Sequence, residues 1–256
     1  MNKLNICYWG VNGNWGDEMN KALCESISGK KVNKISLNDV NSTFRYYCVG
    51  SILQSVPSDN FEVWGTGFMH SDSNVKYIPN KVHAVRGPLT RNLLLKQKIE
   101  CPEVYGDPAL LYPNYYKPNI SKRYKYGIIP HYVDINNHWV KKFKNNSNVK
   151  IINIKNFNTN NFVDEVNECE IILSSSLHGI ICGDSYGIPS YWIKLSDRVG
   201  GNGFKFKDYF ASVGRPLLDP IIPTQRDKIK DIRHYFYDYK IDIDLNKLLE
   251  ACPFKK

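Results

Sequence analysis

The chain has 256 residues, of which 42% are hydrophobic and 23% are charged, and its formal net charge at pH 7 is +9. This composition excludes a disordered chain, and the length suits one large domain or two of ordinary size. No apolar run approaches the roughly 18–20 residues that span a bilayer, and the N-terminus lacks a signal-peptide layout, so we expect a cytoplasmic protein.

The positive charge is compatible with nucleic acid, an anionic membrane surface or a small anionic substrate. Lysines are scattered without a long basic block, and no RRM, zinc-finger or helix-turn-helix signature is present, so no nucleic-acid partner is expected. Peripheral association with the inner face of the membrane stays open, because each basic residue near an anionic leaflet contributes about 1 kcal/mol.

The cysteines do not indicate disulfides or a metal site. Their number is seven, there is no CxxC pair, and most have apolar neighbours, which predicts reduced packing residues. Metal sites need clustered cysteine and histidine, so none is predicted. A formal DxD motif at residues 242–244 is interpreted as a solvated turn.

The first half of the chain alternates strand and helix patterns, which predicts a parallel sheet covered by helices. Strands are predicted at 4–10, 31–37, 45–50, 62–67 and 82–86. Helices are predicted at 17–28 and 88–99, the second beginning with a proline in its first turn. From residue 111 to 126 the composition changes to Tyr, Pro, Asn and Lys, which predicts a linker.

The second half repeats this alternation. Strands are predicted at 126–130, 149–154, 171–173 and 190–195, and helices at 136–144, 162–167, from 177 onward, 225–239 and 244–251. The predicted fold class is α/β, with two Rossmann-like domains facing a cleft and C-terminal helices that pack back on the body. The predicted parts are an N-terminal domain at 1–115, a linker at 116–125, a C-terminal domain at 126–224 and the tail at 225–256.

The segment at 171–189, IILSSSLHGIICGDSYGIP, is the most informative one. An apolar strand turns at three serines, a helix begins at Leu177, and Gly187 followed by Pro189 ends it. His178 then lies in the first helical turn. Since a helix N-terminus binds carboxylates or phosphates, an imidazole there is suited to moving a proton to a bound anion. The alternative is a histidine that only caps or packs.

A second candidate segment, at 8–20, ends the first strand in a loop and opens a helix. Its glycines let a ligand approach the backbone, and Asn14 and Asp17 point to the carboxyl edge of the strand. The spacing is neither GxGxxG nor a P-loop. The alternative role for Asp17 is an N-cap.

Three shorter segments follow predicted strands at 64–67, 84–90 and 105–111. Arg86 stands at a strand end before a helix that begins with proline, where its guanidinium is suited to an anion. The alternative is a salt bridge to a surface carboxylate. Asp107, before Pro108, is suited either to the site or to a simple turn.

Taken in order, these pieces resemble the polysaccharide pyruvyl transferase family. The matching segments are NWGDEMN, WGTG, AVRGPLT, YGDPALL, IPHY, SSSLHGIICGDSYGIP and KFKDYFASVG. The resemblance implies transfer of pyruvate from phosphoenolpyruvate, as donor substrate and without a further cofactor, to a sugar of a cell-surface polysaccharide or its lipid-linked precursor. It also implies a GT-B-like fold, with the acceptor on the N-terminal side and the donor on the C-terminal side.

On this resemblance, His178 is the acid or neutralises the departing phosphate, and Asp17 is the base. Ser176 occupies a position where the family often has an arginine, so a lysine from a nearby strand or loop, Lys194, Lys205 or Lys207, is expected to supply the charge. The predicted catalytic residues are His178 and Asp17, and the predicted substrate-binding residues are Arg86, Asn14, Ser175, Ser176, Gly179, His131, Lys194 and Lys205.

Two other functions are compatible with these patterns. One is a glycosyltransferase or sialyltransferase that uses a nucleotide sugar on the same fold. The other is a non-catalytic partner in a polysaccharide assembly complex. The aromatic residues Tyr132, Trp139 and Trp192 are suited either to stacking on sugars or to the core.

Overall fold

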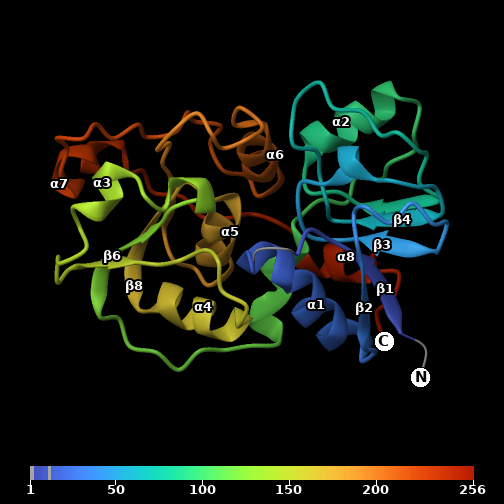
Figure 1. Cartoon of the computed structure of the whole chain (residues 1–256), viewed down its shortest axis with the longest axis horizontal. Helices are drawn as coiled ribbons and strands as arrows, with labels where there is room; N and C mark the ends of the chain where they lie inside the picture. The colour runs from blue at the N-terminus through green and yellow to red at the C-terminus, as the bar shows by residue number, and fades with distance from the viewer. Residues whose placement is uncertain (1–2, 11–12) are drawn as a thin grey trace.

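The computed structural model describes residues 3–10 and 13–256, and it contains two parallel sheets that lie side by side in Figure 1. The N-terminal sheet has the strand order β2-β1-β3-β4-β5. Its strands are β1 (Leu4–Cys7), β2 (Val32–Ile35), β3 (Arg45–Tyr47), β4 (Phe61–Trp64) and β5 (Lys81–Ala84). These strands follow the predicted order, with shorter extents.

Two helices and a 3-10 helix accompany this sheet: α1 (Trp15–Ser28), α2 (Pro88–Lys96) and η2 (Pro108–Asn114). The Asn14 side chain caps α1 by accepting a hydrogen bond from the Gly16 N–H at 3.0 Å. Gly29, with φ at 64°, ends α1 in the left-handed conformation. Of the predicted loop at 8–20, residues 11–12 lie outside the described residues.

The C-terminal sheet has the order β7-β6-β8-β9, and all its pairs are parallel. Its strands are β6 (Tyr124–Ile129), β7 (Val149–Ile151), β8 (Cys169–Ser174) and β9 (Ser190–Trp192). Its helices are α3 (His138–Lys141), α4 (Thr159–Asn167) and α5 (Leu177–Ser185). These two sheets confirm the prediction of a parallel α/β fold.

The two halves share one hydrophobic core, which positions the site. The N-terminal helix α1 packs against α4, with the Trp15 ring stacked on Phe162 at a centroid distance of 5.2 Å. The backbone N–H of Trp15 also donates to the carbonyl of Ile154 at 2.9 Å. The beginning of α1 is therefore held against the C-terminal half.

The segment after β9 forms a helix, α6 (Phe204–Ser212), so the expectation that Lys205 and Lys207 come from strands or loops is wrong. Three aromatic side chains at helical spacing form its buried face: Phe206, Tyr209 and Phe210. Helix α6 contacts α2 of the N-terminal half.

The predicted tail helix at 225–239 is also wrong in extent. Only α7 (Ile229–Ile232) and η4 (Arg233–Tyr235) form there, because the following tyrosines are extended and bind the C-terminal half. For example, Tyr239 donates its hydroxyl to Asp184 at 2.5 Å. The second tail helix forms as α8 (Leu245–Glu250) and contacts the N-terminal half, where Trp64 Nε1 donates to the Leu248 carbonyl at 2.9 Å (Figure 1).

The cysteines and the lengths of the helices can be compared with the sequence-based expectations. All seven cysteines are free and buried, which confirms that they are packing residues. Within the described part of the chain, no helix is both long and apolar enough to cross a bilayer.

Candidate functional site

The beginnings of α1 and α5 meet between the two halves. The His178 imidazole lies against Gly16 so closely that a Cβ built on Gly16 would be 1.9 Å from His178 Nδ1. Only glycine leaves room for the ring in this position. The predicted loop at 8–20 and the predicted strand–helix junction at 171–189 therefore contribute to one site.

A cavity of about 250 Å³ lies at this junction. Its lining comes from α1, the connection between β3 and β4, the loop after β6, α5 and α6. The lining residues that the sequence analysis named are Asn14, Asp17, His131, Tyr132, Ser176, His178 and Lys205. The structure thus brings six of the ten predicted catalytic and binding residues together, with Tyr132 beside them.

A buried carboxylate lies close to the His178 ring. Its Nε2 lies 3.7 Å from Oδ2 of Asp107, which is fully buried, while Asp107 Oδ1 accepts from the Ala109 N–H at 3.0 Å. Neither Nε2 nor Oδ2 has a hydrogen-bond partner within the described residues. Asp107 therefore faces one ring nitrogen of His178, and Nδ1 is the nitrogen that remains for a substrate.

Lys205 supplies positive charge to the cavity. The residue is 7% exposed, and its ammonium group has no carboxylate partner in the part of the chain that the structure describes. Burial and the neighbouring Arg86 lower its pKa to about 8, while Asp17 opposes this shift. A buried ammonium group without a counter-ion favours the binding of an anion.

The first turn of α5 adds to this electropositive character. Ser176 precedes the helix, lines the cavity, and forms no side-chain cap on it. Helix α5 thus directs its positive end and first-turn N–H groups to this region. The neighbouring serine, Ser175, is used structurally, because its Oγ accepts from the His131 N–H at 2.8 Å.

Asp17 is the carboxyl group of the cavity. Burial, reinforced by Glu18, raises its pKa to about 8, against the opposing effect of Lys34 and Lys205. A carboxyl group with this pKa exchanges a proton near neutral pH, as an acid–base group must. Asp17 does not cap α1, because Asn14 does.

His131 is a second histidine at the cavity. Burial, Lys205 and His178 all lower the pKa of His131 to about 3. Its Nδ1 accepts from the Val133 N–H at 3.4 Å, and its ring lies on Tyr132. His131 is therefore a neutral wall of the cavity at physiological pH.

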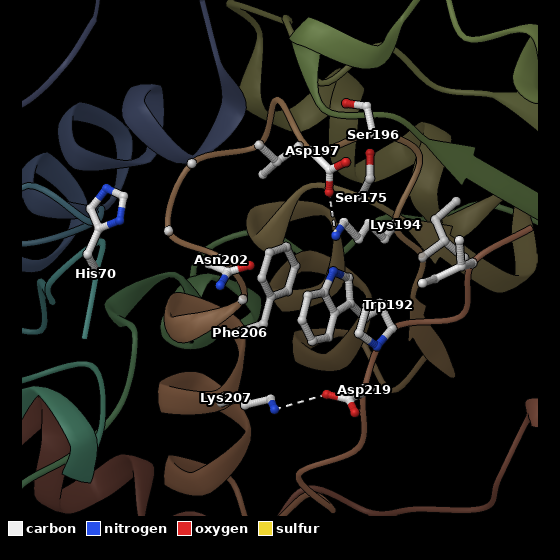
Figure 2. Close-up of a pocket in the computed structure, with 17 residues that line it drawn as sticks. His70, Ser175, Trp192, Lys194, Ser196, Asp197, Asn202, Phe206, Lys207 and Asp219 are labelled. Atoms are coloured by element: carbon white, nitrogen blue, oxygen red, sulfur yellow. Dashed lines mark hydrogen bonds and ion pairs between the residues drawn. The ribbon is translucent and has the colours of Figure 1, made fainter. Parts of the chain in front are cut away.

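A larger cavity, of about 620 Å³, lies beyond the carboxyl ends of β8 and β9 (Figure 2). Ser175 and Lys194 line this cavity and not the smaller one. Lys194 Nζ is paired with Asp197 Oδ1 at 2.6 Å. The structure thus separates these two predicted binding residues from the six around His178. Trp192 also lines the larger cavity, whereas Trp139 is 2% exposed and belongs to the core.

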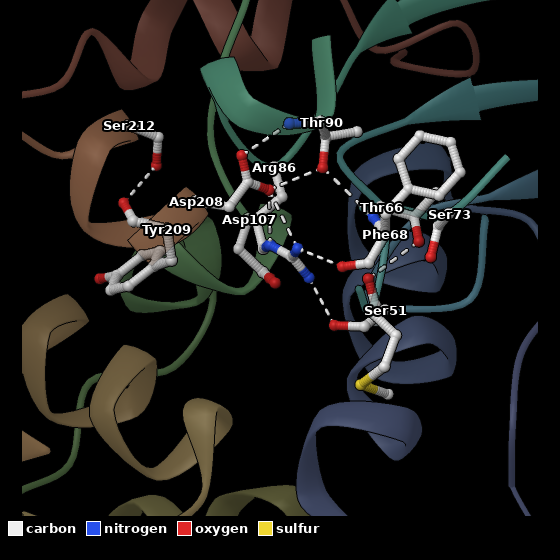
Figure 3. A network of polar contacts seen from close by, with 12 residues as sticks. Ser51, Thr66, Phe68, Ser73, Arg86, Thr90, Asp107, Asp208, Tyr209 and Ser212 are labelled. Carbon is white, nitrogen blue, oxygen red and sulfur yellow. Dashed lines mark hydrogen bonds and ion pairs between the residues drawn. The ribbon is translucent and has the colours of Figure 1, made fainter. Parts of the chain in front are cut away.

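Arg86 is fully buried and bound within the protein (Figure 3). Its guanidinium is 2.9 Å from Asp208 Oδ2 and donates to the Phe68 carbonyl at 2.6 Å and to Ser51 Oγ. The same Asp208 carboxylate accepts from the Thr90 N–H and hydroxyl. Arg86 therefore forms a salt bridge, but with the buried carboxylate of Asp208 and not with a surface carboxylate as the alternative expected, and it does not line the small cavity.

Gly179 has a packing role. A Cβ on it would be 2.4 Å from Ser174 Oγ and 2.9 Å from the Ile129 side chain, so glycine allows α5 to lie close to the sheet. This residue lines neither cavity.

Sequence reasoning gave two residues of the site too little weight. The sequence around Asp107 suits both a turn and a functional residue, and the structure shows that Asp107 caps η2 and also faces His178. Asp208 lies on α6, a helix that the sequence analysis did not predict. Nothing in the local sequence indicates that its carboxylate pairs with Arg86 in the interior. Among the described residues, no group of three or more His, Cys, Asp or Glu is placed to hold a metal.

Three comparisons with known proteins bear on this site. A model of the family described as polysaccharide pyruvyl transferase matches residues 61–197. An uncharacterized protein of Acanthamoeba polyphaga mimivirus is 30% identical over 223 residues, which cover 83% of this chain and 75% of that protein. The succinoglycan biosynthesis protein ExoV of Rhizobium meliloti is 23% identical over 245 residues, which cover 91% of this chain and 73% of that protein. The family match includes His178 and Asp107, whereas Asp17 and Lys205 lie outside it.

Proposed function

Since the chain belongs to the polysaccharide pyruvyl transferase family, we propose that it transfers pyruvate from phosphoenolpyruvate to two hydroxyls of a saccharide, forming a ketal. The family and the resemblance to ExoV support an enzyme of polysaccharide biosynthesis. One observation supports the donor and the chemistry. His178, the positive end of α5 and the buried ammonium group of Lys205 share one small cavity.

The small cavity suits a small, densely charged donor. Its volume of about 250 Å³ lies below the range of about 300–1,000 Å³ that is typical of drug-sized ligands. Phosphoenolpyruvate carries a phosphate and a carboxylate on three carbons. The phosphate is suited to pair with the buried ammonium group of Lys205, and the N–H groups of α5 receive the second anionic group.

The reaction needs one proton transfer to carbon and two new carbon–oxygen bonds. An acid delivers a proton to C3 of the donor, so CH2 becomes CH3, and the first sugar oxygen bonds to C2 as its hydroxyl gives up a proton. The second sugar oxygen then replaces phosphate at C2. Phosphate leaves with the bonding electron pair and accepts the proton of the second hydroxyl.

His178 and Asp17 are the acid–base groups in this scheme. Asp107 stabilises the protonated imidazole through Nε2, and Nδ1 gives the proton to C3. Asp17 accepts the proton of the attacking hydroxyl, and its pKa of about 8 makes its ionised form a stronger base than an ordinary carboxylate. The phosphate that leaves stays opposite Lys205.

This assignment changes the predicted role of Arg86. Asp208 and the Phe68 carbonyl occupy its guanidinium, so we assign it to holding α6 on the N-terminal half. Lys205 begins the same helix, which makes Arg86 a positioning residue for the donor lysine. Lys205 also supplies the charge that the family often has at Ser176.

The resemblance adds finer expectations to this proposal. They are a GT-B-like arrangement of the two domains, a lipid-linked acceptor, action at the inner face of the membrane, and no cofactor besides the donor substrate. The lipid-linked acceptor is consistent with the excess of basic residues.

Calorimetric titration with phosphoenolpyruvate tests the proposed function. We expect saturable binding that weakens at least about tenfold in Lys205→Met, a loss of about 1.4 kcal/mol. The exposed lysine variant Lys96→Met removes the same charge far from the cavity and is the matched control. Binding of a UDP-sugar or CMP-sugar without any binding of phosphoenolpyruvate would assign the chain to the glycosyltransferase class instead.

A further inference from the structure

The larger cavity has the composition of a carbohydrate site. The Trp192 indole and the Phe206 ring are stacked at a centroid distance of 4.3 Å, and both side chains line the cavity. Polar side chains surround this aromatic pair, namely Ser175, Lys194, Ser196, Asp197, Asn202, Lys207 and Asp219 (Figure 2). Aromatic faces pack against the C–H groups of sugar rings, while polar groups bind their hydroxyls.

The charges of this cavity balance, unlike those of the small one. Lys194 is paired with Asp197 at 2.6 Å, and Lys207 is paired with Asp219 at 3.0 Å. A diphosphate would have to compete with both carboxylates for these lysines. The hydroxyl groups of a neutral ligand can bind the ion pairs without separating them, because a carboxylate accepts and an ammonium donates.

The two cavities share walls. In three segments, one residue lines the small cavity and its neighbour in the sequence lines the larger one. Met69, Ser176 and Lys205 line the small cavity, and their neighbours His70, Ser175 and Phe206 line the larger one. A ligand in the larger cavity therefore lies next to a donor in the smaller one.

From these observations we propose that the larger cavity binds the acceptor as a neutral saccharide, with Trp192 as its stacking surface. This inference rests on the proposed function, because it adds the second substrate to the same site. It also places the acceptor mainly on the C-terminal half, whereas the family resemblance implied the N-terminal domain. The volume of about 620 Å³ is sufficient for more than a single ring.

Saturation-transfer NMR on the full chain tests this site. The probes are methyl glycosides of glucose, galactose, mannose and N-acetylglucosamine, together with cellotetraose and lactose. We expect signals from at least one probe, a loss of at least fivefold in Trp192→Ala, and no displacement by UDP. The absence of signals from every probe, their persistence in Trp192→Ala, or their displacement by UDP would overturn the proposal.

A second variant covers the case in which Trp192→Ala does not fold. Asp197 and Asp219 have side chains that are 94% and 86% exposed, so the double variant Asp197→Asn/Asp219→Asn keeps the core intact. It should weaken probe binding several-fold, and unchanged binding in it would contradict the role of the carboxylates.

The same samples separate this inference from the proposed function. Phosphoenolpyruvate affinity, measured by calorimetry, should be unchanged in Trp192→Ala and Asp197→Asn/Asp219→Asn. Glycoside binding that depends on Trp192 without any binding of phosphoenolpyruvate refutes the donor but keeps the saccharide site. Binding of phosphoenolpyruvate without any glycoside refutes only the saccharide site.

Discussion

Arg86 and Asp208 form an ion pair that joins the segment after β5 to α6. The distance between Nη2 and Oδ2 is 2.9 Å, and neither side chain has exposed surface. The contact links the two halves of the molecule, since Thr90 of α2 also donates to the carboxylate. It requires a close approach, because a Cβ at Gly87 would be 2.0 Å from the Asp208 carbonyl oxygen. Helix α6, and Lys205 with it, is fixed by this pair.

Removal of the Asp208 carboxylate should destabilise the protein strongly. Asp208→Ala leaves Arg86 buried without a counter-charge, so we expect a loss of about 3–5 kcal/mol in the free energy of unfolding, measured with urea. The double variant Arg86→Met/Asp208→Leu replaces the pair with apolar side chains and should lose less than the sum of the single variants. Additive losses would show that the two charges do not depend on each other.

The position of His178 against Gly16 gives a second prediction. Gly16→Ala places a Cβ where the imidazole lies, so the ring must leave its present position. We expect phosphate release from phosphoenolpyruvate, measured with a saccharide acceptor, to fall about a hundredfold, as for a misplaced catalytic group. Lys21→Ala, at an exposed position of the same helix, is the control. Activity within twofold of the parent protein in Gly16→Ala would contradict the role of His178.

Donor binding should weaken as the pH rises through about 8. Lys205, with its pKa lowered to about 8 by burial, is charged below this pH and neutral above it. Asp17 gains its negative charge in the same range, which also disfavours an anion. Calorimetry from pH 7 to 10 should show this decline, and Lys205→Arg should reduce it, because arginine keeps its charge. An identical decline in Lys205→Arg would assign the titration to another group.

An arginine at position 176 should substitute for Lys205. Both residues line the small cavity, and the family resemblance implies an arginine where this chain has Ser176. We expect Ser176→Arg to restore most of the roughly tenfold affinity for phosphoenolpyruvate that Lys205→Met loses. Ser185→Arg, at the opposite end of α5, adds the same charge away from the cavity. Equal recovery with Ser185→Arg would mean that only the net charge matters.

Asp17 should reduce stability at high pH. Burial raises the pKa of its carboxyl from 3.8 to about 8 in the folded protein. The resulting loss in the free energy of unfolding is absent below pH 3.8, grows between the two pKa values, and is complete above pH 8. Asp17→Asn should therefore stabilise the protein more at pH 8 than at pH 5, as measured by urea unfolding. The same gain at both pH values would show that the effect does not come from ionisation.

The sequence by itself determined the order of the elements and the junction that carries His178. Apolar strands, the three serines before Leu177 and the glycine after α5 are local signals, because each depends on backbone preferences within a few residues. Periodicity was too short to set the strand ends, and it missed α6. It also overextended the helix at 225–239, where tertiary contacts of the tyrosines, such as Tyr239 with Asp184, hold an extended chain instead.

Only the tertiary structure decided which charged groups meet. Arg86 and Asp208 are 122 residues apart, and His178 is far from both Asp107 and Gly16 in the sequence. The sequence therefore offered Arg86 as an anion ligand, whereas burial of Asp208 beside it makes the ion pair the lower-energy state. The surroundings of Lys205 are likewise decided by the fold, since the residues that line its cavity come from both halves of the chain.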